Sequence, residues 1–270
     1  MQIELIGCTS AGKSTLIREI LQASRAQGID IVQGDDFILQ QFGLGWCESS
    51  PFRGLLMNGA ALVACLITWQ KNYSFYRFAT RLLWRLPIPS ADKRYMLRNV
   101  FKKVGVHAII QRLHTGSQIV LVDEGVLQIA HNLFVHVTAQ VDRQEVSTFV
   151  KLISLPDVVV YLRQPESLLI DRIMARGHHR LPDRSQANVA RFVKQANAVF
   201  DQLTQHPTIA RRLLTVDDEQ QSVVKTTAHD NAFLAIALAI VQNAQLDELE
   251  IQCAPATVAK WVSESIKQPA

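Results

Sequence analysis

The chain has 270 residues, of which 48% are hydrophobic and 19% charged, and its net charge is +4. Twelve glycines and nine prolines are too few for a collagen-like or low-complexity chain, and the apolar share is sufficient for a folded core. The four cysteines lie far apart, without the close spacing of zinc ribbons or redox sites, so we expect reduced thiols. The length favours one enlarged domain, or a domain with a large insertion.

Neither a secretory leader nor a membrane-spanning segment is expected. The first residues, Met1 to Ile6, contain no positively charged leader followed by an apolar stretch, which favours a cytoplasmic protein. The most apolar stretch, Leu55 to Trp69, has 15 residues. A bilayer core requires about 20 residues. We therefore predict a buried helix there and no membrane partner.

Five short apolar runs predict β-strands. They are Gln2–Ile6, Ile29–Val32, Gln118–Val122, Asp157–Leu162 and Leu213–Val216. Helical periodicity occupies Thr15–Ala23, Asp92–Leu113, Gly125–Val135, Asp142–Ser154, Pro165–Arg176, Gln186–Thr204 and Asn231–Gln245. Nearly all-apolar strands that alternate with helices are typical of a parallel sheet covered on both faces, so the predicted fold class is α/β.

The interval between the second and third predicted strands is unusually long and basic. It holds 82 residues, 36 to 117, with eleven Lys or Arg residues and three acids. A crossover needs only about a dozen residues. We expect a helical insertion over 37–117 that binds the substrate, with the aromatic residues from Tyr73 to Trp84 in its core. The charge attracts an anionic partner or lies on solvated helix faces, and both readings stay open.

Residues 7–14 read GCTSAGKS and fit the pattern GxxxxGK[ST] between a predicted strand and helix. Gly7 and Gly12 permit the tight turn in which successive amides point toward phosphate oxygens. We expect Lys13 to reach the β- and γ-phosphates of ATP and the Ser14 hydroxyl to bind Mg²⁺. The predicted nucleotide-binding residues are Gly7, Thr9, Ser10, Ala11, Gly12, Lys13, Ser14 and Thr15.

Two acidic pairs follow predicted strands, where the carboxyl ends of a parallel sheet face a ligand. We expect Asp123 to hold Mg²⁺ and Glu124 to orient the nucleophile or contact the substrate. A plain turn before the next helix is the alternative for this pair. Asp35 or Asp36 can take the proton from an attacking hydroxyl as the general base. Helix N-capping is the alternative for Asp36.

Three arginines follow the fourth predicted strand at intervals of four: Arg172, Arg176 and Arg180. This spacing aligns them along one helix face and into the next loop. Planar guanidinium groups stabilise the negative charge that phosphoryl transfer spreads over oxygens. We predict a catalytic role for all three in a lid over 163–185, with ordinary solvated arginines as the alternative.

These motifs resemble the P-loop kinases of nucleosides, nucleotides and other small metabolites. Asp157–Arg163, the following Pro165-Glu166 and the arginine pattern are similar to the thymidylate-kinase and deoxynucleoside-kinase branch. Asp35-Asp36-Phe37 is similar to the Asp-Asp-Phe of uridine kinases, phosphoribulokinases and antibiotic phosphotransferases. The resemblance covers roughly 1–35 and 116–218. It implies the three-layer P-loop NTPase fold, a parallel sheet of order 2-3-1-4-5 and a mobile lid that closes on ATP.

The chain also departs from that branch. No Arg-Glu-Pro-Gly follows the second predicted strand and no Asp-Arg-Tyr follows the third, so thymidylate is not the expected acceptor. We predict an ATP- and Mg²⁺-dependent kinase over 1–245, which phosphorylates a hydroxyl of a small molecule, with a helical tail at 246–270. The positive insertion favours an anionic acceptor. The alternatives are a nucleoside monophosphate kinase, a nucleic-acid-binding P-loop NTPase or polynucleotide kinase, and a non-catalytic nucleotide binder.

Overall fold

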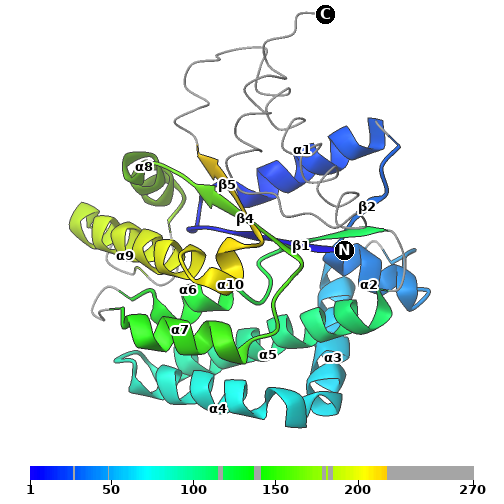
Figure 1. The fold of residues 1–270 in the computed structure, drawn as a ribbon, viewed down its shortest axis with the longest axis horizontal. Helices are drawn as coiled ribbons and strands as arrows, with labels where there is room; N and C mark the ends of the chain where they lie inside the picture. Colours follow the sequence, from blue (N-terminus) through cyan, green and yellow to red (C-terminus); the bar gives the residue numbers. More distant parts are fainter. Residues whose placement is uncertain are drawn as a thin grey trace, which may run out of the picture.

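A five-stranded sheet lies at the centre of the computed structural model, which describes residues 1–26, 28–47, 49–114, 118–136, 141–177, 181 and 185–217. The strands are β1 (Gln2–Ile6), β2 (Ile31–Gln33), β3 (Ile119–Asp123), β4 (Val158–Arg163) and β5 (Leu213–Asp217). Neighbouring strands pair in parallel in the order β2-β3-β1-β4-β5, as the resemblance implied (Figure 1). The segments that follow β1, β2 and β3 therefore meet at one edge of the sheet.

Helices cover both faces of the sheet. They are α1 (Lys13–Ala26), α2 (Gly34–Gln41), α3 (Ser50–Ile67), α4 (Trp69–Arg85), α5 (Ser90–Leu113), α6 (Ile129–Phe134), α7 (Arg143–Leu152), α8 (Glu166–Arg176), α9 (Gln186–Thr204) and α10 (Pro207–Ala210). Figure 1 shows α1 on the opposite side of the sheet from α4, α5 and α7, which pack together in one layer. The α/β class is thereby confirmed.

Two predicted elements begin later than the sequence indicated. The helix expected from Gly125 begins at Ile129, because the carboxylate of Glu4 on β1 accepts the amides of Leu127 and Gln128 and holds the preceding turn. The second strand begins at Ile31, because the amide of Ile29 donates to the carbonyl of Ser24 at the end of α1. The other predicted ends within the described ranges differ by three residues or fewer. The predictions for 231–245 and 246–270 lie outside the described residues.

Helices α2 to α5 occupy the described part of the long interval between β2 and β3. α3 crosses α5 so closely that a side chain at Gly105 would overlap the carbonyl of Ala61. Met57 and Ala61 lie on the buried face of α3, in a core shared with α2 and α5. The prediction of a buried helix is wrong for the opposite face of α3, because the helix packs on α5 through one side. More than half exposed there are Leu55, Leu62, Val63, Leu66 and Ile67.

The aromatic residues of α4 divide between core and solvent. Phe75 and Tyr76 are buried, as the sequence predicted, but Tyr73 and Trp84 are at least half exposed because they lie on the other side of the helix. Among the described helices, none alone has both the length and the apolar content to cross a membrane. Residues 51–67 and 69–85 meet that criterion only as a pair, bent by 105° at their junction.

Candidate active site

The predicted phosphate-binding loop, residues 7–14, joins β1 to α1 in the way the sequence predicted. Gly7 and Gly12 adopt φ angles of 151° and 100°, which favour glycine, and a Cβ atom on Gly7 would lie 2.7 Å from the carbonyl oxygen of Leu162. The amide of Thr15 donates to the carbonyl of Gly12 and begins α1. Residues 9–15 line a cavity of about 1310 Å³, at the edge of the sheet where the strands end. The loop thus forms one wall of a large cavity.

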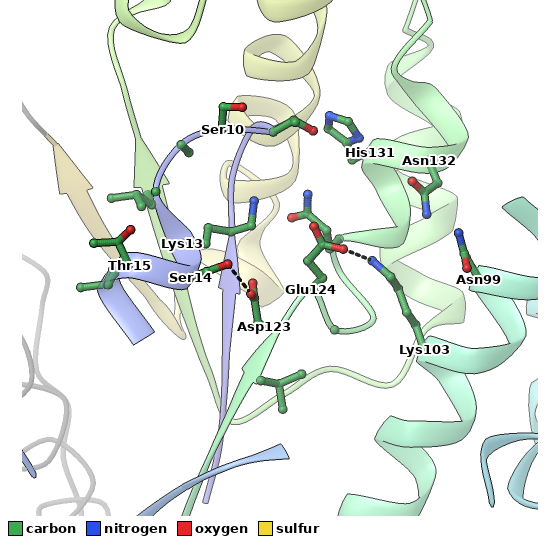
Figure 2. Close-up of a pocket in the computed structure, with 18 of the residues that line it drawn as sticks. Ser10, Lys13, Ser14, Thr15, Asn99, Lys103, Asp123, Glu124, His131 and Asn132 are labelled. Atoms are coloured by element: carbon green, nitrogen blue, oxygen red, sulfur yellow. Dashed lines mark hydrogen bonds and ion pairs between the residues drawn. The ribbon is translucent and has the colours of Figure 1, made fainter. Parts of the chain in front are cut away.

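Lys13 is buried within this loop. Its Nζ donates to the carbonyl oxygens of Gly7 at 3.2 Å and Cys8 at 3.1 Å. These carbonyls hold the ammonium at the loop, within the cavity wall that the sequence assigned to phosphate. Figure 2 shows its side chain pointing into the cavity above Ser14 and Asp123.

Ser14 and Asp123, the two residues predicted to hold Mg²⁺, lie in contact. The Ser14 hydroxyl donates to Oδ2 of Asp123 at 2.9 Å (Figure 2). The other carboxylate oxygen, Oδ1, is buried without a hydrogen-bond partner, so it can accept a cation. No group of three or more His, Cys, Asp or Glu side chains able to hold a metal occurs in the described part of the chain. One carboxylate and one hydroxyl suit Mg²⁺, which keeps several waters and takes phosphate oxygens as ligands.

Asp35 and Asp36 both lie in the first turn of α2, but their side chains have different surroundings. Asp35 lines the cavity, and burial raises the pKa of its carboxyl, while the nearby cations Lys102 and Arg53 act in the opposite direction. Asp36 accepts a hydrogen bond from Arg53 of α3 and is not among the residues that line the cavity. Capping does not explain Asp36, because α2 follows Gln33 and has no side-chain cap. Of the two candidates for the base, only Asp35 lines the cavity.

Two of the three predicted arginines lie beside the phosphate-binding loop. Arg172 of α8 donates to the carbonyls of Ser10 at 3.4 Å and Ala11 at 3.5 Å, and Arg176 lines the same cavity. Both side chains are also exposed to solvent, so the alternative of ordinary solvated arginines stays open for Arg172 and Arg176. Arg180 lies outside the described residues, so its predicted role remains a prediction.

Glu4 is a buried carboxyl that sequence reasoning did not single out. One oxygen accepts the amides of Leu127 at 2.7 Å and Gln128 at 3.1 Å, and the other has no hydrogen-bond partner. Burial raises the pKa of Glu4 to about 7, against these hydrogen bonds and the nearby Lys103. A Cβ atom at Gly125 would lie 2.5 Å from Glu4, so glycine is needed there. A signal was present, because Glu4 interrupts an otherwise apolar strand core.

Gln128 connects this turn to the phosphate-binding loop. Its Nε2 donates to the carbonyl of Gly7 at 3.0 Å, and its Oε1 accepts the amide of Gly7 at 3.3 Å. Both hydrogen bonds are buried, so the Gln128 side chain fixes the backbone of Gly7 at the start of the loop. Sequence alone offered no signal for this contact, since a glutamine between apolar residues is typical of many helix ends.

Lys103 is a further residue that the sequence did not mark. It projects from α5, its side chain is only 14% exposed, and its Nζ donates to Oε2 of Glu124 at 3.4 Å (Figure 2). Burial lowers the pKa of Lys103, while Glu124 and Glu4 act in the opposite direction. Glu124 lines the cavity and adopts a φ of 56°, which non-glycine residues rarely adopt. The role predicted for it toward nucleophile or substrate stays a prediction.

The positive charge of the insertion lies mostly away from the cavity. Of its cations, Lys102 and Lys103 line the cavity, whereas Arg53 and Arg85 pair with the carboxylates of Asp36 and Glu145. Six others are exposed: Lys71, Arg77, Arg81, Arg94, Arg98 and Arg112. The alternative of solvated helix faces therefore accounts for most of the charge excess, and two lysines remain to act on an anion in the cavity.

Comparison with known proteins finds distant structural likeness and no sequence relative. No protein-family model matches the chain, and no curated protein matches it. A solved structure of deoxyadenosine kinase from M. mycoides, with the products dCMP and dCDP bound, is 15% identical with a TM-score of 0.46, over 90% of this chain and 100% of that one. The YorR protein from Bacillus subtilis, in complex with phosphorylated GDP, is 12% identical with a TM-score of 0.39, over 93% of this chain and 100% of its own. The functional argument therefore depends on the site itself.

Proposed function

We propose that this chain is an ATP- and Mg²⁺-dependent kinase that transfers the γ-phosphoryl group to a hydroxyl of a small molecule. The observation that carries the proposal is a single cavity lined by both the phosphate-binding loop and Asp35, whose carboxyl has a raised pKa. Its volume, about 1310 Å³, is large enough for a nucleotide and an acceptor together. A nucleotide-binding protein that acts only as a switch requires the phosphate-binding loop, but it does not require a general base such as Asp35 in the same cavity.

The residues of the loop bind the nucleotide. Backbone amides of the loop after Gly7 surround the phosphates, because Gln128 already accepts the amide of Gly7. Lys13 leaves the carbonyls of Gly7 and Cys8 and binds the β- and γ-phosphates. Ser14 and Asp123 hold Mg²⁺, which neutralises charge on the phosphate oxygens when it is bound. Arg172 lies against the same loop and adds positive charge there.

Asp35 acts on the acceptor. As the acceptor oxygen forms its bond to the γ-phosphorus, the hydroxyl proton passes to the Asp35 carboxylate. The bond from the γ-phosphorus to the bridging oxygen breaks, and ADP leaves with the electron pair. Because desolvation raises the pKa of Asp35, its carboxylate is a stronger base than an aspartate of ordinary pKa.

The rest of the cavity favours a polar acceptor. Tyr95 and Asn99 of α5 and Asn132 of α6 line it, and Figure 2 shows Asn99 and Asn132 on the same side of the view, away from Lys13 and Ser14. Amide and phenol groups donate and accept hydrogen bonds, as a heterocycle with a sugar requires. We therefore propose a nucleoside as the class of acceptor.

Lys102 and Lys103 favour a second candidate, a nucleoside monophosphate, because they place two cations in the same cavity. A phosphate acceptor is already ionised and needs no base. The effect of replacing Asp35 therefore distinguishes the two candidate functions. In the proposed hydroxyl kinase, Asp35→Asn lowers kcat about 100- to 10,000-fold. In a monophosphate kinase, it leaves turnover almost unchanged.

Formation of ADP from Mg·ATP tests the proposal. Purified protein is assayed with nucleosides, nucleoside monophosphates, sugars and sugar phosphates, beside the Lys13→Ala variant. We expect nucleosides to stimulate ADP formation and Lys13→Ala to abolish it. Turnover that no acceptor raises above the rate with water, or that survives in Lys13→Ala, contradicts the proposal.

A further inference from the structure

A second buried cation faces the phosphate-binding loop from another part of the chain. Lys103 extends from α5 toward the turn after β3, and Lys13 reaches the same cavity from α1 (Figure 2). Their charges are close enough that Lys13 acts on the ionisation of Lys103. The fold therefore places ammonium groups on two walls of the region where the γ-phosphate is expected.

The partners of Lys103 do not make it a good structural ion pair. Its Nζ contacts Glu124 at 3.4 Å, but the Glu124 side chain is 57% exposed and can be hydrated instead. Such a pair contributes about 0–1 kcal/mol, whereas placing an ammonium group in a protein interior costs several kcal/mol. The attraction of Glu124 and of the buried Glu4 offsets part of that cost, and the side chain lines the cavity.

The backbone of Glu124 is strained. Its φ of 56° costs about 1–2 kcal/mol for a residue with a side chain. That conformation directs its carboxylate toward Lys103, across the cavity from Ser14 (Figure 2). Strain and a costly buried charge at one contact are typical of functional sites.

We propose that Lys103 is a catalytic residue whose ammonium binds the equatorial oxygens of the γ-phosphoryl group during transfer. Glu124 is its counter-ion until nucleotide and acceptor are bound. This role rests on the proposed kinase function. As the bond from phosphorus to the ADP oxygen lengthens and the acceptor oxygen approaches, negative charge remains on the three equatorial oxygens. Lys13 and Arg172 face them from the loop, and Lys103 faces them from α5.

The test compares Lys103→Met with the wild-type protein in steady-state turnover. One lost charge contact to a transition state costs about 100- to 1,000-fold in kcat. We expect that loss with the KM for ATP changed less than about threefold, because the contact forms mainly in the transition state. Lys103→Arg keeps the positive charge, so its kcat is expected to be more than a tenth of the wild-type kcat. The matched control is Lys151→Met, an exposed lysine of α7 outside the cavity.

Two further readouts exclude a merely structural role. Ethylamine is expected to restore turnover to Lys103→Ala in a concentration-dependent way, because the small amine supplies the missing charge. ADP with aluminium fluoride and the acceptor, which mimics the phosphoryl group in transfer, is expected to bind Lys103→Met at least about 100-fold more weakly than wild type. Affinity for ADP alone is expected to stay unchanged.

The outcomes separate the two proposals. If wild-type protein shows no acceptor-stimulated ADP formation, the kinase function fails and the role of Lys103 fails with it. If wild type is active and Lys103→Met retains a similar kcat, only the role of Lys103 is overturned. If Lys103→Met does not fold, Lys103→Gln and Lys103→Arg take its place. Equal loss in both, with no rescue of Lys103→Ala by ethylamine, also overturns the role.

Discussion

Replacing Glu4 with glutamine is expected to change how the stability of the chain depends on pH. Glu4 is fully buried in β1, and burial raises its pKa from 4.5 to about 7. Glutamine has nearly the same shape and keeps an oxygen that can accept the amides of Leu127 and Gln128. It cannot ionise, so the substitution removes the titration and keeps these contacts.

The magnitude follows from the two pKa values. The unfolded chain releases the Glu4 proton near pH 4.5 and the folded chain near pH 7. Between these values the folded state binds more protons, so the free energy of unfolding falls as pH rises. At about 1.36 kcal/mol per unit, the full loss is about 3 kcal/mol. About 2.5 kcal/mol of this loss falls between pH 5 and pH 8.

Urea unfolding of both proteins at these two pH values measures the effect. The wild type is expected to lose about 2.5 kcal/mol more than Glu4→Gln on going to the higher pH. Any constant cost of the substitution cancels in this difference of differences. Glu166→Gln, which removes an exposed carboxyl on α8, controls for the change in net charge. Parallel pH dependence, within about 0.5 kcal/mol, would refute the reasoning and show Glu4 ionised in the folded chain.

Three other predictions concern packing and the base. Gly105→Ala is expected to lower the free energy of unfolding by about 1–3 kcal/mol, because its methyl group overlaps the Ala61 carbonyl and forces α3 from α5; an unchanged urea midpoint contradicts that contact. Asp35→Asn is expected to lower kcat about 100- to 10,000-fold, since it removes the base. Asp36→Asn, its matched control outside the cavity, is expected to retain most activity, and equal losses in the two would show that both act together. The pH profile of kcat/KM is expected to fall on acidification at a pH above 3.8, because the raised pKa of Asp35 makes its carboxylate take up a proton earlier; an acid limb below that value contradicts this assignment.

The sequence was most informative where local chemistry determines structure. The phosphate-binding loop follows from two glycines, a lysine and a serine at fixed spacing between a strand and a helix. The apolar strands predict a parallel sheet, and its observed order agrees with the resemblance. Asp123 was assigned by its position after the third predicted strand, and its contact with Ser14 agrees with that assignment.

The sequence was least informative where distant segments meet. Asp35 and Asp36 are chemically alike and adjacent, and only the packing of Arg53 from α3 separates them. Lys103 is one of many cations in the insertion until α5 brings it to Glu124. The apolar residues of α3 predict burial, but hydrophobicity alone cannot tell a buried face from one that remains exposed. These features depend on tertiary contacts, which periodicity does not encode.

Phosphorus NMR of the reaction mixture tests the central claim most directly. Mg·ATP is mixed with the wild-type protein and a nucleoside, and the signals are followed with time beside the Lys13→Ala variant. The account predicts that the γ-phosphate signal of ATP disappears while ADP and a phosphomonoester of the nucleoside grow in equal amounts, and that Lys13→Ala shows no change. Release of inorganic phosphate alone, or an unchanged ATP spectrum with every hydroxyl acceptor tested, would contradict it.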